Sequence, residues 1–299
     1  MADGAGDGGA GGSCIASVVV PAHNEEAVIG RLLHALEGDD DAIEVVVACN
    51  GCDDRTAAIA REHGARVVEV DTASKIAALN AGDAVATAFP RFYVDADIVL
   101  TRRAVESVAT ALAGPRVLCA APPLVVDDRG RPWPVRAYVA VWQRTPYLQA
   151  DHVGSGVYAM SAAGRARFDR FPDVIADDLF ARNLFARSER AVVPTEPFVI
   201  QAPWTLGALV RRRVRIDAGN RELAARAGLP PLPGAGEGVG PWWRAIVDHP
   251  RLATSAVIYA GVNLVARAVA RWRSRRDRSI GWGRDATTRE RASHHAGTG

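Results

Sequence analysis

The chain has 299 residues, 48% of them hydrophobic, and a formal net charge of +2 at pH 7. This length can bury one sizeable core, alone or with an appendage. The near-neutral balance excludes an electrostatic argument for a nucleic-acid partner. Lys75 is the single lysine among 36 basic residues, so we interpret it as a position that needs a compact ammonium group and not a guanidinium.

The N-terminus and the cysteines bear on location. Residues 1–13 are mostly Gly, Ala and Asp, without the basic and apolar regions of a signal peptide, and predict a disordered tail. Cys49 and Cys52 form a CxxC pair, but no second pair or paired histidines complete a zinc site. A redox pair stays open as an alternative. We interpret the two as small apolar side chains at a strand end, in a reduced and cytoplasmic protein.

Short β-branched runs alternate with helical stretches in the first third of the chain. Strands are predicted over residues 15–20, 43–48, 66–70 and 91–94, with helices after Asn24, over 54–63 and over 75–86. Asn24 is the predicted N-cap of the first helix, in which Val28, Leu32 and Leu36 repeat at the spacing of one buried face. The alternation favours an α/β fold, in which a mostly parallel sheet carries helices on both faces.

The later part of the chain has weaker patterns. Strand-like stretches cover residues 117–126, 156–160 and 191–200, an arginine-rich segment follows at 211–215, and 230–240 is a Pro/Gly-rich loop. Residues 252–270 are largely apolar, but their uncharged part is shorter than the roughly 20 residues of a spanning helix. Packing on the core, lying on an anionic membrane and spanning it all stay open for this segment.

Polar residues follow each of the four predicted strands. Parallel sheets bind ligands at the carboxyl ends of their strands, so these residues are expected to meet at one edge. The fourth strand is followed by Asp95 and Asp97, whose carboxylates can present oxygens to Mg²⁺ or Mn²⁺ shared with substrate phosphates. Such a DxD pattern is common in ordinary turns, so its context decides its meaning.

Four sequence blocks supply that context. They are SVVVPAHNEE (17–26), VACNGCDDRT (47–56), SKIAALNAG (74–82) and FYVDAD (92–97). In this order they resemble family 2 glycosyltransferases, closely over residues 15–100 and more loosely to about 215. The resemblance implies the GT-A fold, a Rossmann-like α/β domain over residues 14–225. A linker and C-terminal helices would cover 226–284, and a disordered tail 285–299.

The resemblance also implies the reaction and the binding site for the donor. The reaction is transfer of a sugar, with inversion, from a nucleotide-diphosphate sugar to an acceptor hydroxyl, with Mn²⁺ or Mg²⁺ as cofactor. Asp97, together with Asp95, is the implied metal ligand. The implied donor-binding residues are Pro21, His23, Glu25, Asn50, Lys75, Asp95, Arg213 and Arg215. Asn50 stands where the family has an acidic residue that recognises the nucleoside, which leaves the base recognised here open.

The catalytic and acceptor residues come from two later blocks. ADDL (176–179) resembles the family's acidic pair, which implies Asp178 as general base and Asp177 as its supporting acid. An acidic helix N-terminus is the alternative interpretation. HVGSGVY (152–158) resembles the small-residue loop on the acceptor side, which implies Gly154, Ser155 and Gly156. RRVRI (212–216) differs from the Gln-x-x-Arg-Trp block of processive members, so processive polymerisation is not supported.

The acceptor itself is not identified by these patterns. A lipid-linked or cell-envelope glycan would fit a protein whose last helix lies on the inner face of the membrane. Two other functions stay open. A sugar-1-phosphate nucleotidyltransferase would need a Gly-rich, Arg-containing first loop, which is absent here. A non-catalytic member, which binds nucleotide sugar or docks on membranes without transfer, is favoured by the departure at Asn50.

Overall fold

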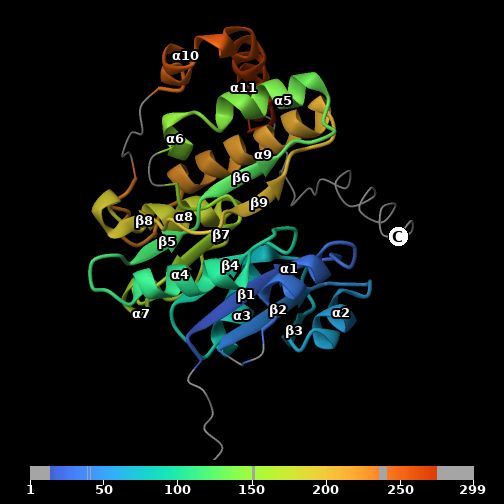
Figure 1. The fold of residues 1–299 in the computed structure, drawn as a ribbon, viewed down its shortest axis with the longest axis vertical. Helices are drawn as coiled ribbons and strands as arrows, with labels where there is room; N and C mark the ends of the chain where they lie inside the picture. Colours follow the sequence, from blue (N-terminus) through green and yellow to red (C-terminus); the bar gives the residue numbers. More distant parts are fainter. Residues whose placement is uncertain (1–13, 39, 41, 150–151, 236–240, 275–299) are drawn as a thin grey trace, which may run out of the picture.

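The structure is a computed structural model that describes residues 14–274, except 39, 41, 150, 151 and 236–240. The predicted tails over 1–13 and 285–299 lie outside the described residues, as do five positions of the predicted 230–240 loop. Figure 1 shows a sheet with flanking helices at one end of the molecule and a group of helices at the other.

The main sheet has seven strands in the order β3-β2-β1-β4-β7-β5-β8. β1 (Ala16–Ala22) lies between β2 (Ile43–Asn50) and β4 (Arg91–Val94) and is parallel to both. The remaining strands are β3 (Arg66–Val70), β5 (Cys119–Ala121), β7 (Val157–Met160) and β8 (Arg190–Val192). Only β7 runs antiparallel to its neighbours within this sheet, which confirms the predicted mostly parallel α/β sheet.

Helices cover both faces of the sheet because the side chains of β1 alternate between them. Val18 and Val20 pack with residues of α1 (Ile29–Leu36) and α4 (Arg102–Leu112). Val19 packs on the other face, with residues of α3 (Lys75–Val85). α2 (Thr56–Glu62) lies beside α1. All these strand side chains are fully buried, so the core requires apolar residues on both faces of β1.

The predicted start of the first helix is wrong. α1 begins at Ile29, and Asn24 lies in a loop with a φ of 53° instead of capping the helix. The Asn24 side chain bonds to Asp53 in the loop after β2, so it holds two strand-end loops together. The predicted buried face is confirmed, because Val28, Leu32 and Leu36 are all buried.

Two long predicted strands are each divided in the structure. Residues 117–126 form β5 and β6 (Leu124–Asp127), and residues 191–200 form the end of β8 and β9 (Phe198–Gln201). β6 and β9 pair in a separate two-stranded sheet. Prolines at 122, 123, 194 and 197 lie between the halves and cannot donate ladder hydrogen bonds, which explains both breaks.

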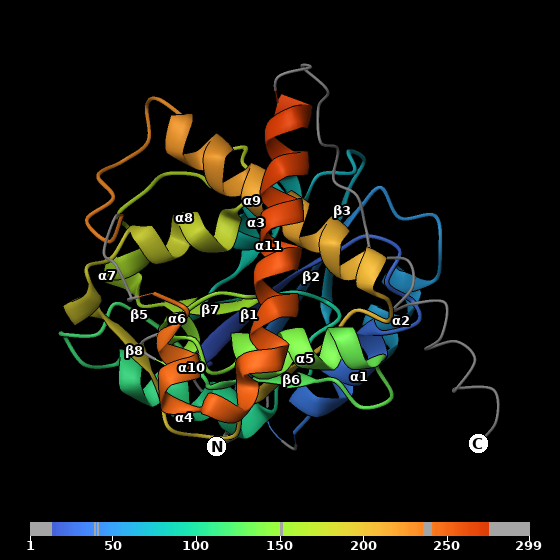
Figure 2. The same ribbon diagram turned by 90° about the horizontal axis from the view of Figure 1, so that it is seen from above.

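Four helices form what we call the helical cap, above the small sheet in Figure 1. They are α5 (Trp133–Trp142), α9 (Leu206–Ala225), α10 (Arg244–Asp248) and α11 (Ala253–Ser274). Shorter elements are α6 (Pro146–Gln149), α7 (Ala162–Arg165), α8 (Asp177–Asn183) and the 3₁₀ turns Arg187–Glu189 and Pro250–Leu252. Figure 2 shows α11 crossing α9 and α5, with which it makes contact.

Helix α11 has one packed side and one exposed apolar side. It buries Val262, Ala266 and Ala270, whereas Val257 is 70% and Leu264 65% exposed. The segment Pro250–Arg273 has a mean hydropathy of 1.5 and is long and apolar enough to cross a membrane by length and composition. Packing on the protein therefore accounts for only one side of this helix.

Candidate active site

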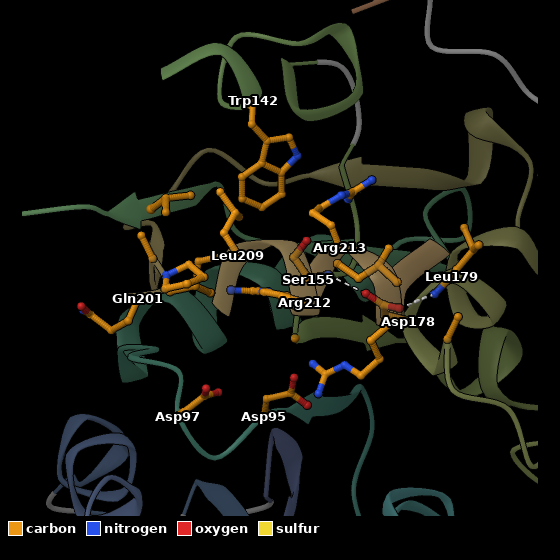
Figure 3. Close-up of a pocket in the computed structure, with 18 of the residues that line it drawn as sticks. Asp95, Asp97, Trp142, Ser155, Asp178, Leu179, Gln201, Leu209, Arg212 and Arg213 are labelled. Carbon is orange, nitrogen blue, oxygen red and sulfur yellow. Dashed lines mark hydrogen bonds between the residues drawn. The ribbon is translucent and has the colours of Figure 1, made fainter. Parts of the chain in front are cut away.

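A cavity of about 690 Å³ lies between the carboxyl ends of β1 and β4 and the helical cap. Most of the residues predicted for the site line this cavity: Pro21, Glu25, Lys75, Asp95, Asp97, Ser155, Gly156, Asp177, Asp178, Arg213 and Arg215. His23, Asn50 and Gly154 are not among its lining residues. Figure 3 shows Asp95 and Asp97 on one side, Trp142 on the opposite side, and Ser155 and Asp178 between them.

Lys75 joins the DxD segment to the acidic pair. It is the first residue of α3, a helix capped by Ser74, whose hydroxyl accepts from the Ala77 N–H. Its Nζ lies 2.8 Å from Asp95 Oδ1 and 2.9 Å from Asp177 Oδ1. Although burial lowers the pKa of Lys75, the two carboxylates raise it above its usual value. The ammonium therefore stays charged between them.

Asp177 is more buried than its partner in the acidic pair. Burial, with the nearby charges of Asp178 and Asp95, raises the pKa of Asp177 to about 6 despite the attraction of Lys75. The hydroxyl of Tyr158 lies 3.3 Å from its Oδ2. These contacts give Asp177 the role of fixing Lys75 in place, from a position turned away from solvent.

The loop before β7 contacts both the DxD segment and Asp178 through its backbone. Gly154, Ser155 and Gly156 all have positive φ, at 125°, 57° and 95°. A Cβ at Gly156 would lie 3.0 Å from Asp95 Oδ2, and one at Gly154 would lie 3.4 Å from Asp178 Oδ2. Small residues are required here because the backbone and both carboxylates approach so closely.

Asp178 is held by two backbone donors. Its Oδ1 accepts from the N–H of Leu179 at 2.8 Å and its Oδ2 from the N–H of Ser155 at 3.0 Å. Asp178 also stands in the first turn of α8, as the helix-dipole alternative requires, but unlike a simple capping residue it lines the cavity. The fixed carboxylate faces the space above Asp95 and Asp97 in Figure 3.

The first two loops are tied together beside the cavity. The Asn50 side chain is 0% exposed and donates from Nδ2 to the Ala22 carbonyl at 2.8 Å. Its backbone carbonyl contacts His23 Nδ1, and Thr56 Oγ1 accepts from the Glu25 N–H at 2.7 Å. Asn50 and His23 therefore hold the loops after β1 and β2 together without lining the cavity. Their roles in donor binding remain predictions.

The residues present fit a divalent ion shared with a substrate. Within the part of the chain that the structure describes, no three His, Cys, Asp or Glu side chains gather as a metal-binding group. Asp95 and Asp97 nevertheless both line the cavity with hard carboxylate oxygens. Mg²⁺ and Mn²⁺ are commonly held by one or two carboxylates, with substrate phosphates and water completing the coordination. The described residues offer no group that would hold such a metal without a substrate.

On the cap side of the cavity, Arg213 and Arg215 of α9 were predicted, but the residues around them were not. The cavity is also lined by Tyr138, Trp142 and Tyr259, and by Arg182, which is only 6% exposed. Two signals were available: Arg182 follows Asp178 by one helical turn, and residues 133–142 form an aromatic-rich helix. The long-range contact between α5 and α11 has no local sequence signal.

Comparisons with known proteins agree with this arrangement. Residues 17–173, more than half of the chain, match the family described as Glycosyl transferase family 2. The 4,4'-diaponeurosporenoate glycosyltransferases of Staphylococcus aureus strains MRSA252 and USA300 are 34% identical over 122 residues. That match covers 38% of this chain and 32% of the relatives, so it spans about a third of their length.

Solved structures show the same fold. A mannosyltransferase from Pyrobaculum calidifontis, in complex with GDP-Man and Mn²⁺, has a TM-score of 0.53 at 21% identity, over 95% of this chain and 80% of that one. Glucosyl-3-phosphoglycerate synthase from Mycobacterium tuberculosis, in complex with phosphoglyceric acid, has a TM-score of 0.53 at 22% identity, over 72% and 80%. The chain thus belongs to glycosyltransferase family 2 and has the GT-A fold.

Proposed function

We propose that this enzyme transfers a sugar from a nucleotide-diphosphate sugar to an acceptor hydroxyl, with inversion and with the help of Mn²⁺ or Mg²⁺. The observation that carries the proposal is the meeting of Lys75, Asp95, Asp97 and Asp178 in one cavity. They come from three segments of the chain, with Asp95 and Asp97 on the same one, and each has the chemistry that one part of the reaction needs.

The donor half of the reaction needs positive charge near the leaving diphosphate. Asp97 and Asp95 would hold the divalent ion, which supplies Lewis-acid stabilisation of that charge. Lys75, fixed between Asp95 and Asp177, would add a second cation, and Arg213 or Arg215 a third. Pro21 and Glu25 line the end of the cavity proposed for the nucleotide.

The acceptor half needs a base with a fixed orientation. Asp178 would accept the proton of the acceptor hydroxyl as that oxygen attacks the anomeric carbon from the face opposite the diphosphate. Its hydrogen bonds from Leu179 and Ser155 hold one orientation of the carboxylate before the substrate arrives. Holding donor and acceptor in line supplies the remaining advantage.

The solved neighbours support the donor and metal classes. The Pyrobaculum calidifontis neighbour was solved with GDP-Man and Mn²⁺. The Mycobacterium tuberculosis synthase was also solved with Mn²⁺, UDP and glucosyl-3-phosphoglycerate, with a TM-score of 0.52. Both carry a nucleotide and Mn²⁺ on the same fold, as we propose here.

We further propose that the enzyme docks on the inner face of a membrane and acts on a lipid-linked or cell-envelope acceptor. The exposed side of the last two helices carries Val247, Val257, Leu264 and Trp272. Basic side chains in the last turn of α11, Arg271 and Arg273, would meet anionic headgroups.

A thermal-shift screen tests the reaction class. UDP-, GDP- and dTDP-sugars are added to the purified enzyme with Mn²⁺, Mg²⁺ or a chelator. We expect a metal-dependent stabilisation by one donor, absent in Asp97→Ala and kept in Asp169→Ala, which removes an exposed carboxylate that does not line the cavity.

Two outcomes would contradict the proposal. No shift with any donor, from a folded protein, would favour the non-catalytic alternative. Release of pyrophosphate from a nucleoside triphosphate and a sugar 1-phosphate would favour a nucleotidyltransferase.

A further inference from the structure

We propose that the acceptor is an anionic amphiphile, whose negative group binds Arg182 and whose apolar chain lies along an aromatic wall of the cavity. This inference rests on the proposed function, because it assigns a chemical class to the acceptor of that reaction.

Arg182 is a buried charge without a described counter-ion. Its side chain lines the cavity, is 6% exposed, and has no hydrogen-bond partner at Nε or Nη2. Its guanidinium lies 5.3 Å from the centre of the Tyr147 ring. Burying an unpaired guanidinium is costly, so a retained one indicates that a ligand supplies the missing negative charge.

The described neighbours of Arg182 do not supply that negative charge. Burial, followed by the positive charge of Arg182, lowers the pKa of His152 to about 3, so the imidazole is neutral at pH 7. Burial raises the pKa of Tyr147 to about 12, so the phenol stays protonated. Asp178 stands one turn earlier on α8, but its oxygens accept from Leu179 and Ser155. Among the described residues, Arg182 and Asp178 form no ion pair.

The net charge of the cavity lining also favours an anionic acceptor. Seven basic and five acidic side chains line it. A bound nucleotide-diphosphate sugar carries about two negative charges and a divalent cation carries two positive ones, so together they leave the excess of basic side chains unchanged. An acceptor that brings a carboxylate or phosphate would neutralise this excess beside Arg182.

The aromatic wall lies across the cavity from the DxD segment. We define it as Tyr138, Val139, Trp142, Leu209, Trp242 and Tyr259. Figure 3 shows Trp142 and Leu209 on the side of the cavity away from Asp95 and Asp97. The presence of Val139 and Leu209 among the rings favours a hydrocarbon chain over a sugar ring.

The wall continues to the protein surface. The ring of Tyr259 stacks on Tyr138 at 4.9 Å and contacts the ring of Trp242 at 5.3 Å. Trp242 is 36% exposed and the adjacent Trp243 is 52% exposed. A chain held along these rings would leave the cavity toward the exposed apolar side of α11, where a membrane would supply it.

Simple probes test the class without knowledge of the natural acceptor. Dodecanoate, dodecyl phosphate and dodecanol are titrated below their aggregation limits at pH 7.5, with binding measured by calorimetry. We expect both anions to bind about tenfold more tightly than dodecanol, because they gain a charge-assisted hydrogen bond. Acetate and inorganic phosphate, which lack the chain, should bind far more weakly than either anion.

Three variants separate the two parts of the site. Arg182→Gln should reduce the preference for the anions over dodecanol to near one. Trp142→Ala should weaken all three twelve-carbon probes alike. Arg116→Gln, which removes an exposed arginine that does not line the cavity, should change nothing.

The proposal is overturned if dodecanol binds the unaltered enzyme as tightly as dodecanoate, or if Arg182→Gln keeps the preference. The first comparison needs no variant, so it holds even if Arg182→Gln does not fold. Donor-dependent thermal shifts are recorded on the same samples. If they persist while the probes fail, only the acceptor class is wrong; if they too are absent, the proposed function itself is contradicted.

Discussion

Asp178 and Asp177 are adjacent in the sequence, yet their surroundings differ. Asp177 is 3% exposed and bonded to Lys75, whereas Asp178 is half-buried, lines the cavity and accepts two backbone N–H groups. An acceptor hydroxyl can approach Asp178 from the cavity, while Asp177 is committed to Lys75. The two carboxylates therefore suit different tasks, proton transfer for Asp178 and placement of a cation for Asp177.

We expect Asp178→Asn to reduce transfer by about 10²–10⁴-fold, the range attributed to a general base. The amide keeps the size of the carboxylate but cannot accept the proton. Donor affinity should stay within about twofold, since Asp178 has no proposed contact with the donor. Single-turnover kinetics and calorimetric titration with the donor measure the two quantities. An equal loss of both would remove Asp178 from the role of base.

The position of Asn50 was predictable from the sequence, but the contacts of its side chain were not. The sequence blocks correctly indicated the strand end on which it lies, but not the direction of its side chain. In the structure its amide donates to the Ala22 carbonyl, a bond that a carboxylate in the family's usual form could not make. The departure from the family thus has a local physical reason, which depends on a neighbouring strand and is not visible in the sequence block.

At the scale of elements, Asp83 ties together three of them. It lies on α3, is 5% exposed, and accepts from Tyr93 Oη at 2.6 Å, from Arg91 at 2.8 Å and from Arg165 at 2.6 Å. Tyr93 and Arg91 belong to β4, and Arg165 belongs to α7. Burial raises the pKa of Asp83, but the bonds from Arg165, Tyr93 and Arg91 more than offset this and lower the pKa below its usual value.

Asp83→Asn should lower the free energy of unfolding by about 3 kcal/mol at pH 7, because it leaves two partly buried arginines, Arg91 and Arg165, without their carboxylate. Since the folded pKa of Asp83 is lowered, its stabilisation is fully present above the unfolded pKa of about 4 and is lost as the pH falls through the folded value. Urea unfolding at pH 7 and pH 3 should show a difference between wild type and variant that shrinks in acid. A difference that stays constant would exclude this linkage.

The elements themselves were predictable to different degrees. β3 and β4 have the predicted bounds because each is a short run rich in β-branched or aromatic residues between turn residues. The breaks at 122–123 and 194–197 contain prolines, a signal that the predicted long strands passed over. The predicted start of α1 was wrong for a different reason. The backbone N–H groups of residues 24–26 donate to side chains of the loop after β2 and the first residue of α2, and these tertiary contacts outweigh a local capping pattern.

At the scale of the whole molecule, the cavity lies between two halves of the protein. The sequence motifs identify the sheet half, which would bind the donor, but not most of the helical cap. The donor half follows the strand ends of the sheet, whose order places β1 and β4 side by side. The next strands along the chain, β2 after β1 and β5 after β4, lie on opposite sides of this pair. The cap half depends on α5, α9 and α11 meeting across more than a hundred residues of sequence. The DxD residues and the acidic pair were therefore predictable as neighbours in one site, whereas the aromatic wall was not; their roles in metal binding and proton transfer remain proposals.

The exposed side of α10 and α11 leads to the last prediction, which concerns how the molecule meets a membrane. Val247, Val257 and Leu264 are each at least 65% exposed, and an arginine-rich turn ends α11. Apolar burial and attraction to anionic lipids together stabilise such a helix at a bilayer surface. We expect the enzyme to float with vesicles of phosphatidylglycerol and far less with phosphatidylcholine, and high salt should weaken binding because it screens the arginines.

Leu264→Glu should abolish vesicle binding without changing the thermal unfolding of the protein, because its side chain is already in water. Ala113→Glu is the matched control, since it adds the same charge at an exposed position on the C-terminal end of α4. Equal flotation of both variants would show that this side of α11 does not meet the membrane. Retention of the protein on vesicles after an alkaline carbonate wash would instead indicate a spanning helix, which would require α11 to leave its contacts with α9 and α5. Release by that wash, together with the salt dependence, would place α11 on the surface, where the open end of the aromatic wall can receive an acceptor directly from the bilayer.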